Sequence, residues 1–324
     1  MRLARRRFLQ LSALAFPALA AAPPMAQAQA WPARPIRIVV GFPPGGPNDI
    51  LARLTAEWLA ARLSQKVEVE NLASSDAAAA AVAHAPADGY RLLVIGPANA
   101  IDATLPKSRD FDFRREFVPV AGITREALAM VVHPSVPART LEDFFNYAQA
   151  NPGKVKMAVT NQGTAPQVTG ELFRTMSGLD LVVVPLAGGP LALRAVVAGD
   201  VAMMFGPLSA AIGAIRDGKV RALAVTSADH AAALPDVPPM ADYLFDFEAS
   251  AVTGIAAPRA TPADIVARLN REINAAYADE TMKKRFADTG GEVLAGTSAE
   301  FGVLFGAEIA KWARLMRLAG IVIR

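Results

Sequence analysis

Short apolar runs alternate along this chain with longer segments in which apolar residues recur every three or four positions. The runs predict strands at 37–42, 66–70, 90–95, 154–160, 181–185, 201–205 and 220–226. The longer segments predict helices at 47–63, 77–85, 141–150, 165–176, 190–198, 208–217 and 298–317, with one more capped by Thr261-Pro262. Strands that alternate with helices indicate βαβ units and a mainly parallel sheet, so the predicted fold class is α/β.

Two helices carry apolar stripes that should face the core. In the first helix the stripe is Leu51, Leu54, Trp58 and Ala61. In the last one it is Phe301, Phe305, Ile309, Trp312 and Met316, a core face rather than a cofactor site.

Two apolar stretches interrupt the alternation, at 117–133 and at 251–257. We interpret the first as the crossing from one domain into a second, and the other as the return. This predicts one domain from 31–127 plus 252–324 and another from 128–251, which suits a chain of 324 residues.

A glycine loop followed by a proline-led helix occurs three times after a predicted strand. The loops contain Gly45-Gly46 before Pro47, Gly163-Thr164 before Pro166, and Gly188-Gly189 before Pro190. Glycine lets a ligand approach bare backbone, and a helix N-terminus favours an anion. The alternative for any one such loop is a tight turn without a ligand.

Further loops should follow the strands that end near residues 95 and 205. Neutral polar groups, backbone N–H donors and helix N-termini would then converge from two domains and hold a small carboxylate, partly through water. Asp49 lies in the first helical turn, where a structural role is favoured. The candidate ligand-binding residues are Phe42, Pro44, Gly45, Gly46, Asn48, Asp49, Gly96, Ala98, Asn99, Asn161, Gln162, Gly163, Thr164, Ala165, Gln167, Gly188, Gly189, Phe205 and Gly206.

The first 30 residues are predicted to be an export signal. Arg5-Arg6-Arg7 precedes an apolar run from 11 to 22, and small residues allow cleavage near Ala28 or Ala30. The arginines resemble the twin-arginine pattern, although Sec export stays open. Without this leader 29 basic and 30 acidic residues remain, so nothing indicates nucleic-acid binding. The expected location is the periplasm, with membrane contact only through a partner.

The sequence lacks the usual catalytic patterns. The histidines are His84, His133 and His230, without zinc spacing between them, and cysteine is absent. No serine-nucleophile motif, Walker loop or dinucleotide fingerprint occurs. We therefore expect a binding protein with no enzymatic activity, no cofactor and no metal.

Several motifs, spread over nearly the whole chain after the leader, resemble the Bug family, the extracytoplasmic solute receptors of tripartite tricarboxylate transporters. They are Arg34-Pro35-Ile36-Arg37-Ile38-Val39-Val40, Pro44-Gly45-Gly46 with Asp49, Glu70-Asn71, Asp88-Gly89-Tyr90, Asn151-Pro152-Gly153-Lys154, Gly163-Thr164, Gly170-Glu171-Leu172-Phe173 and Leu234-Pro235-Asp236-Val237-Pro238. The resemblance implies a type II periplasmic binding protein, with two doubly wound α/β domains joined by two crossing strands and a ligand cleft between them. It also implies that the loop after the first strand and the loop at Gly163-Thr164 hold a ligand carboxylate.

The resemblance further implies delivery of a small carboxylate to a membrane permease, and we expect a monomer. Two alternatives are a ligand-sensing module for a sensor kinase and a secreted hydrolase. Departures from the family pattern at Leu186-Ala187, Gly206-Pro207 and 96–99 remove polar groups, which favours a larger or more apolar acid. Arg125 at the crossing either meets a second ligand carboxylate or pairs with an acid such as Glu126.

Overall fold

Two separate β-sheets carry the fold in the computed structural model, which describes residues 31–104 and 113–321. The predicted leader, 1–30, lies outside the described residues. The first sheet has the order β11-β4-β10-β3-β1-β2 and the second β7-β6-β8-β5-β9. The strands of the first sheet are β1 (Ile36–Val40), β2 (Val67–Asn71), β3 (Arg91–Ile95), β4 (Phe117–Glu126), β10 (Ala251–Pro258) and β11 (Glu292–Val293). Those of the second are β5 (Leu128–Val132), β6 (Val155–Val159), β7 (Leu181–Pro185), β8 (Met203–Pro207) and β9 (Arg221–Val225).

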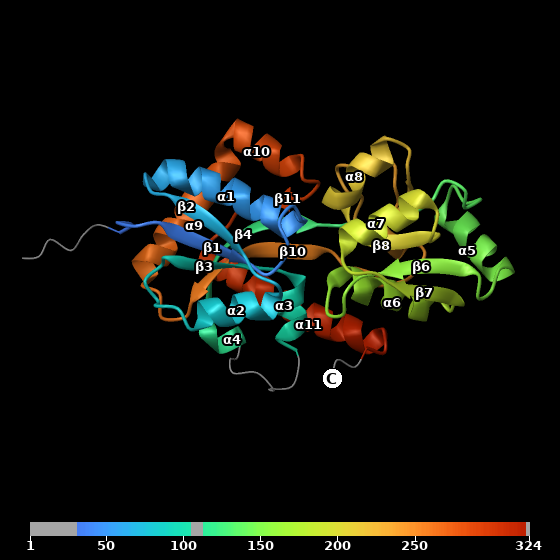
Figure 1. The fold of residues 1–324 in the computed structure, drawn as a ribbon, viewed down its shortest axis with the longest axis horizontal. Coiled ribbons are helices and arrows are strands. Elements are labelled where there is room, and N and C mark those ends of the chain that lie inside the picture. The colour runs from blue at the N-terminus through green and yellow to red at the C-terminus, as the bar shows by residue number, and fades with distance from the viewer. Residues whose placement is uncertain (1–30, 105–112, 322–324) are drawn as a thin grey trace, which may run out of the picture. The chain divides into compact units, whose positions relative to one another are not determined.

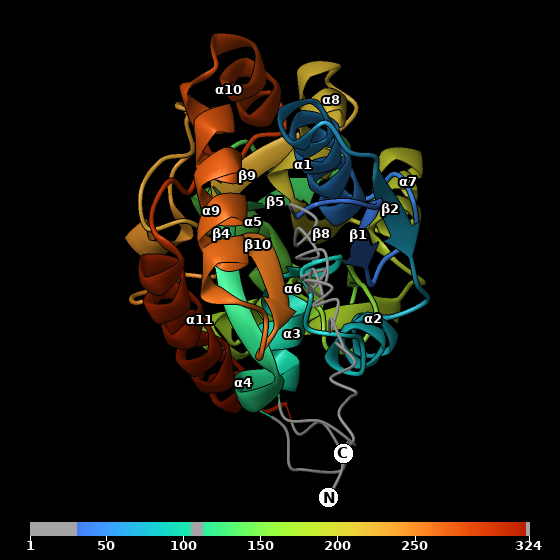
Figure 2. The same ribbon diagram turned by 90° about the vertical axis from the view of Figure 1, so that its left-hand side faces the viewer.

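Helices cover both sheets (Figure 1). Those beside the first sheet are α1 (Pro47–Leu63), α2 (Ser75–Ala83), α3 (Pro97–Asp102), α4 (Phe113–Glu116), α9 (Ala263–Ala278), α10 (Glu280–Ala287) and α11 (Ser298–Leu318). Those beside the second are α5 (Leu141–Ala150), α6 (Ala165–Ser177), α7 (Gly189–Ala198) and α8 (Leu208–Arg216), and a short 3-10 helix, η1, spans Met240–Asp242. Figure 1 and Figure 2 show α10 at the top of the first sheet and α11 at its lower part near α3 and α4, so α10 and α11 cover this sheet from different sides.

The strand directions bring the loops of both sheets to one junction. In the first sheet β4 ends at Glu126, one residue before β5 begins the second sheet, and β1 and β3 run parallel to β4. In the second sheet β5 runs antiparallel to β8, with Leu128 opposite Pro207, and β6 and β7 are parallel to β8. The carboxyl ends of β1, β3, β6, β7 and β8 therefore all point toward the junction between the sheets.

One apolar core runs under both sheets. It joins Trp312 and Phe305 of α11 to Phe173 of α6, to Phe205 of β8 and to Phe247. The ring centroids of Phe173 and Phe205 are 5.4 Å apart, which is the usual distance for packed aromatic pairs. The described residues from Pro32 onward form one compact unit. A second cluster, which includes Val131, Val196 and Leu208, packs α7 and α8 onto the other face of the second sheet.

The predicted strands and most predicted helices are confirmed within one or two residues. The division of the chain into domains at 127/128 and 251/252 stays a prediction. The stripe on α11 is confirmed, because all five of its residues are buried. The stripe on α1 is wrong at two positions, since Ala61 is exposed and Trp58 is half-buried. Trp58 instead donates its indole N–H to the Glu272 carbonyl at 2.6 Å, so α9 satisfies its polar edge.

Three local predictions are corrected by the backbone. The loop expected at 96–99 is the start of α3, because Pro97 opens the helix and the Gly96 amide is capped by the Asn99 side chain. Gly206 belongs to β8 and pairs with Ala129 rather than lying in a loop. The expected cap at Thr261 is absent, since Pro262 is the N-cap of α9 and the Thr261 hydroxyl is buried without a partner among the described residues.

Candidate functional site

The loop between β1 and α1, residues 41–46, is held in place by one buried carboxylate. Asp49, 2% exposed, accepts hydrogen bonds from the Gly45 amide at 2.8 Å and from Arg53 Nε at 2.9 Å. Its other oxygen accepts from Asn71 Nδ2 at 2.9 Å. Gly45 has a φ of +82°, a conformation that other residues adopt only with strain. The loop is therefore a braced structure rather than a loose turn.

The same contacts set the charge of Asp49. Burial alone would raise the pKa of this carboxyl, but the hydrogen bonds from Arg53, Gly45 and Asn71 outweigh burial and lower the pKa below its usual value. Asp49 is therefore ionised and already paired. These contacts agree with the structural role that the sequence favoured, while a contact between Asp49 and a ligand stays a prediction.

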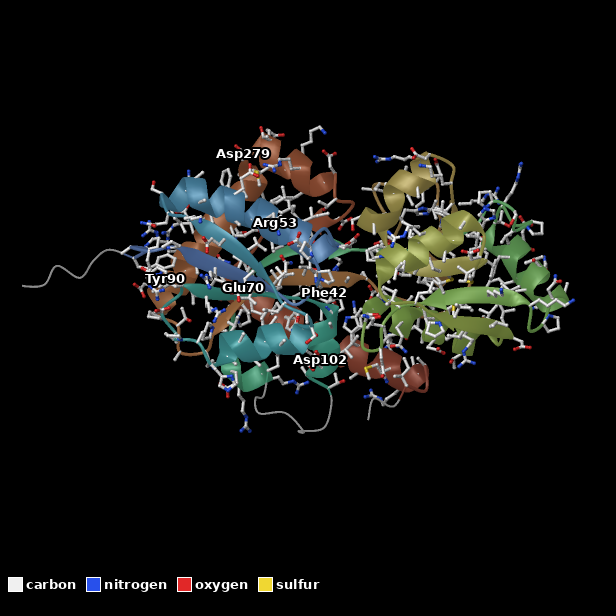
Figure 3. All side chains as sticks on the ribbon, in the orientation of Figure 1. Phe42, Arg53, Glu70, Tyr90, Asp102 and Asp279 are labelled. Atoms are coloured by element: carbon white, nitrogen blue, oxygen red, sulfur yellow. The ribbon has the colours of Figure 1, made fainter. Side chains whose placement is uncertain are left out.

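Asn71 and Arg53 are braces that the list of candidates omits. Asn71 ends β2 and donates to the Phe42 carbonyl at 2.9 Å as well as to Asp49. Figure 3 labels Phe42 where β1 leads into the loop and Arg53 on α1. The signal for Asn71 was available, because β1 and β2 are parallel neighbours whose carboxyl ends lie side by side. The signal for Arg53 was its i,i+4 spacing from Asp49 on one helix face.

The turn after β3 lies next to the loop after β1. An added Cβ on Gly96 would be 3.7 Å from Asn48 Nδ2 and 3.7 Å from Thr253 Oγ1, so these side chains lie beside bare backbone. Ala98 and Asn99 are buried, and the Asn99 carbonyl oxygen of the side chain accepts the Gly96 amide at 3.1 Å. The structure thus brings Asn48 and Gly96 together.

On the second sheet, the loop between β6 and α6 has its own internal bonds. The hydroxyls of Thr164 and Thr160 are 2.7 Å apart, and Thr164 donates to the Asn161 carbonyl at 2.7 Å. Thr164 is the N-cap residue of α6 by position, but its side chain makes no capping bond. Gly163 has a φ of +77°, and its amide donates to Gln167 Oε1 at 3.4 Å. Asn161 and Gln162 are exposed, whereas Ala165 is buried.

The remaining candidates lie after β7 and within β8. Gly188 has a φ of +96° and donates its amide to the Leu186 carbonyl at 2.8 Å. Gly189 is the first residue of α7, and a Cβ there would meet nothing within 4 Å. Phe205 is 1% exposed and packs in the core, and Gly206 is buried in the sheet, so the structure does not bring these two side chains to a loop surface.

Donors at this junction come from helix N-termini rather than from the glycine turns themselves. Of the backbone N–H donors expected in these turns, those of Gly45, Gly163 and Gly188 already have an acceptor within their own loop or helix. The first-turn amides of a helix have no partner within that helix, and α1, α6 and α7 all begin at this junction. Their positive ends favour a bound anion.

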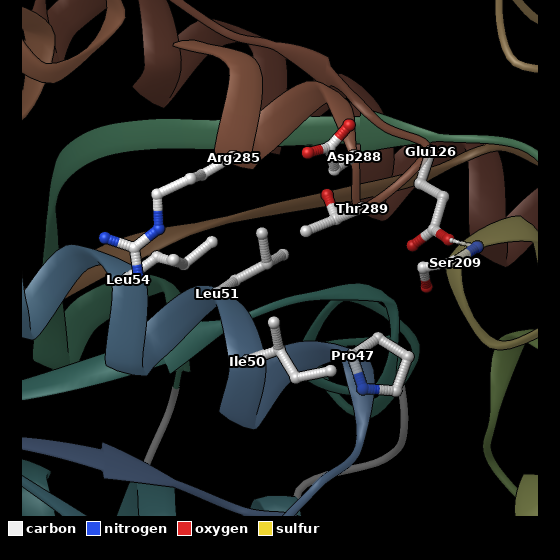
Figure 4. A pocket seen from close by; sticks show the side chains of 9 residues that line it. All are labelled: Pro47, Ile50, Leu51, Leu54, Glu126, Ser209, Arg285, Asp288 and Thr289. Carbon is white, nitrogen blue, oxygen red and sulfur yellow. Dashed lines mark hydrogen bonds between the residues drawn. The ribbon is translucent and has the colours of Figure 1, made fainter. Parts of the chain in front are cut away.

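A pocket of about 310 Å³ opens beside the first turn of α1, between the two sheets (Figure 4). Its lining comes from α1, from α10 and the residues after it, from the end of β4 and from the start of α8. The lining residues are Pro47, Ile50, Leu51, Leu54, Glu126, Ser209, Arg285, Asp288 and Thr289. Pro47 is the first residue of α1 and directly follows the glycine loop, so the pocket lies beside the N-terminus of that helix.

Glu126 is the buried acid of this pocket. It is 8% exposed, and its Oε1 accepts the Ser209 amide of α8 at 2.6 Å, which links the end of the first sheet to the second. Burial raises the pKa of Glu126 to about 7, and the hydrogen bonding from Ser209 only partly opposes that rise. Arg125 is exposed, and among the described residues Glu126 accepts from Ser209 and not from Arg125. The acid on which the Arg125 charge acts is Glu308, where it opposes the rise in pKa that burial causes.

Metal-ligand clusters and membrane-spanning helices are absent from residues 31–104 and 113–321. No group of three or more His, Cys, Asp or Glu side chains there could hold a metal ion. Nor does any helix in those ranges combine the length and apolar character that a membrane crossing needs.

Residues 51–321 match the family model described as the tripartite tricarboxylate transporter family receptor, TctC. The chain belongs to this family. TctC receptors are periplasmic substrate-binding proteins and not enzymes, which confirms the expectation of no enzymatic activity and overturns the hydrolase alternative. The resemblance to the Bug family is confirmed as well. The chain is 32% identical to the protein BugT of Bordetella pertussis over 298 residues, which is 90% of this chain and 91% of BugT.

Solved structures agree with the TctC assignment. A Rhodopseudomonas palustris protein, Rpa4515 with adipate, superposes with a TM-score of 0.83 at 30% identity, over 90% of this chain and 99% of that one. MatC from Rhodopseudomonas palustris with bound malate superposes with a TM-score of 0.78 at 31% identity, over 88% of this chain and 99% of MatC. The periplasmic binding protein BugD superposes with a TM-score of 0.81 at 27% identity, over 90% of this chain and 99% of BugD. The predicted two-domain periplasmic binding fold is confirmed.

Proposed function

We propose that this TctC receptor binds one small organic carboxylate at the junction of its two sheets and delivers it to a tripartite tricarboxylate-type permease. Binding would use the candidate residues named above from the loops after β1, β3, β6 and β7. The two sheets would close on the ligand by rotation about the crossings β4–β5 and β9–β10, as in other hinged binding proteins.

The observation that carries this proposal is the convergence of helix N-termini from both sheets. The first turns of α1, α6 and α7 follow strands whose carboxyl ends face one junction. Each start combines outward N–H groups with a positive dipole end, which together suit a carboxylate. The negative charge of Asp49 is offset by Arg53 and by the donors of Gly45 and Asn71, so it does not repel an anion there.

The relatives support the same ligand class. Rpa4515 was solved with adipate and MatC with malate, and both are small carboxylates. We further propose that the leader 1–30 directs export and is removed near Ala28 or Ala30, and that the receptor works as a monomer. Mass spectrometry of the protein recovered from the periplasm tests the cleavage of the leader. Light scattering of the same protein tests the monomeric state.

Calorimetry with a panel of mono-, di- and aromatic carboxylates tests the function. A binding acid should also raise the melting temperature, because a ligand that binds only the native state stabilises it by mass action. Gly46→Val and Gly189→Val should each lower the affinity for that acid about tenfold or more, since the valine side chain would lie between the ligand and the helix N-terminus. Gly46 has an ordinary φ of −79°, so valine adds bulk there without backbone strain.

Gly306→Val is the matched control, because Gly306 is exposed on α11 and a Cβ there meets nothing within 4 Å. It should leave the affinity unchanged. Unchanged affinity in both Gly46→Val and Gly189→Val would refute the placement of the site, and a panel without any binding acid would refute the function.

A further inference from the structure

The pocket beside α1 has one apolar and one polar wall. Pro47, Ile50, Leu51 and Leu54 of α1 form the apolar wall. Figure 4 shows the Glu126 carboxyl on the opposite side, with one oxygen joined to the Ser209 amide and the other directed into the pocket. The Ser209 hydroxyl is buried and lies beside the Glu126 carboxyl.

The other charged groups of this pocket are already paired. Both terminal nitrogens of Arg285 donate to the Glu57 carboxylate, at 2.6 and 2.8 Å. Asp288 pairs with Lys284 at 3.0 Å and is largely exposed. In Figure 4 the Arg285 guanidinium lies beside Leu54, at the end of the pocket away from Glu126. No positive side chain lining the pocket is therefore available to a ligand group beside Glu126.

We propose that Glu126 determines specificity: the pocket takes the far end of the bound acid, and Glu126 selects a hydrogen-bond donor there, a hydroxyl or an ammonium group, over a second carboxylate. This inference rests on the proposed function, because the first carboxylate must be held by the helix N-termini. The ligand class is then a monocarboxylate with an apolar body along α1 and a terminal donor.

The reason is the cost of unmatched groups in a buried site. A terminal donor would satisfy the free Glu126 oxygen, and the Ser209 hydroxyl could share the same group. A carboxylate there would face a second carboxylate, without a cation to offset the repulsion. A terminal methyl would leave the Glu126 oxygen without a partner once the sheets close and exclude water.

Two matched ligand series test the proposal by calorimetry. The straight-chain series is hexanoate, 6-hydroxyhexanoate, 6-aminohexanoate and adipate, and the aromatic series is benzoate, 4-hydroxybenzoate, 4-(aminomethyl)benzoate and terephthalate. In a series that binds at pH 8, the hydroxy or amino acid should bind about tenfold or more tighter than the diacid. At pH 6 this ratio should fall, because Glu126 becomes protonated.

Glu126→Gln keeps the shape and removes the charge. In this variant the preference over the diacid should shrink to about threefold or less. Glu142→Gln, on an exposed residue of α5, is the matched control and should keep the wild-type ratio. A diacid that binds wild type as tightly as its hydroxy partner overturns the inference, as does an unchanged ratio in Glu126→Gln.

The two proposals fail differently. Binding of other carboxylates but of neither series overturns the role of Glu126 and leaves the carboxylate receptor intact. If no carboxylate binds at all, both proposals fall.

Discussion

Two buried acids near the junction show how partners decide the charge of a residue. Asp49 is surrounded by donors from Gly45, Arg53 and Asn71, so its pKa is lowered and its charge is stable. Within the described ranges Glu126 is joined only to Ser209, and burial raises its pKa to about 7. The difference lies in what each side chain meets across the fold rather than in the two side chains themselves.

Glu126 should make the stability of the protein depend on pH. Its folded pKa lies above the model-peptide value near 4.5, so its contribution is full below that value and is lost as pH rises through about 7. Arg285 of α10 and Asp288, just after that helix, face the same pocket, and α1 contributes no charge to it. Relative to Glu126→Gln, wild type should lose up to about 3 kcal/mol of unfolding free energy between pH 4.5 and 8.

Urea unfolding of both proteins at pH 4.5 and 8 measures this difference. Other titrating groups, such as Glu308, are common to both proteins and cancel. Parallel pH profiles of the two proteins would show that Glu126 has an ordinary pKa in the folded state.

At the scale of elements, the crossing strands depend on the absence of side chains at two glycines. Phe301 of α11 lies against Gly254 of β10 and Gly122 of β4. An added Cβ on Gly254 would be 2.6 Å from the Ala121 carbonyl oxygen, and the Phe301 ring would be closer still. Backbone cannot move away cheaply, so these glycines permit α11 to pack directly on the crossing strands.

Gly254→Ala should therefore destabilise the protein by about 1–3 kcal/mol or more through overpacking. The denaturation midpoint measures the change. Gly306→Ala on α11 is the control, because the added Cβ would be unobstructed and alanine favours a helix. An equal midpoint for Gly254→Ala and wild type would mean that α11 can shift outward at little cost.

At the scale of the whole molecule, α11 joins the two sheets on one side. It packs in the core that reaches Phe173 and Phe205 of the second sheet, and it is tied to the second crossing by Lys311. Lys311 Nζ lies 2.9 Å from Glu308 Oε1, 3.2 Å from Glu248 Oε2 and 2.9 Å from the Ser250 carbonyl. Burial raises the pKa of Glu308, and Lys311 opposes that rise. On the other side, the described residues that line the pocket connect the two sheets through the hydrogen bond from the Ser209 amide to Glu126.

Removing this cation should cost more than an exposed ion pair would. Lys311→Met leaves Glu308 and Glu248 without their shared cation, and breaking a buried pair in this way costs about 3–5 kcal/mol. Chemical denaturation of the single variant Lys311→Met and of the double variant Lys311→Met/Glu308→Leu measures the loss of unfolding free energy. The double variant should recover much of the loss, and a double variant as unstable as the single one would contradict the pairing.

Periodicity was informative where burial follows from local pattern. The α11 stripe and the strand positions were predicted correctly, because consecutive turns or alternating residues face one environment. It failed where a distant partner changed that environment. Trp58 is half-buried because the Glu272 carbonyl accepts its indole, and Glu126 is buried because α8 supplies an amide. The brace at Asn71 was missed for the same reason, whereas Arg53 was missed although its i,i+4 spacing from Asp49 is a local signal.

The sequence by itself determined the α/β class, the order of the elements, the glycine loops at strand ends and the membership in a carboxylate-receptor family. These follow from spacing, turn residues and motifs that act over a few positions. Only the tertiary structure decided that the loops meet at one junction, that Asp49 is paired and that Glu126 lies in a pocket beside them without a cation partner among the residues that the structure describes. Such charges and distances depend on strand directions and on contacts between residues far apart in the chain, which local pattern does not encode.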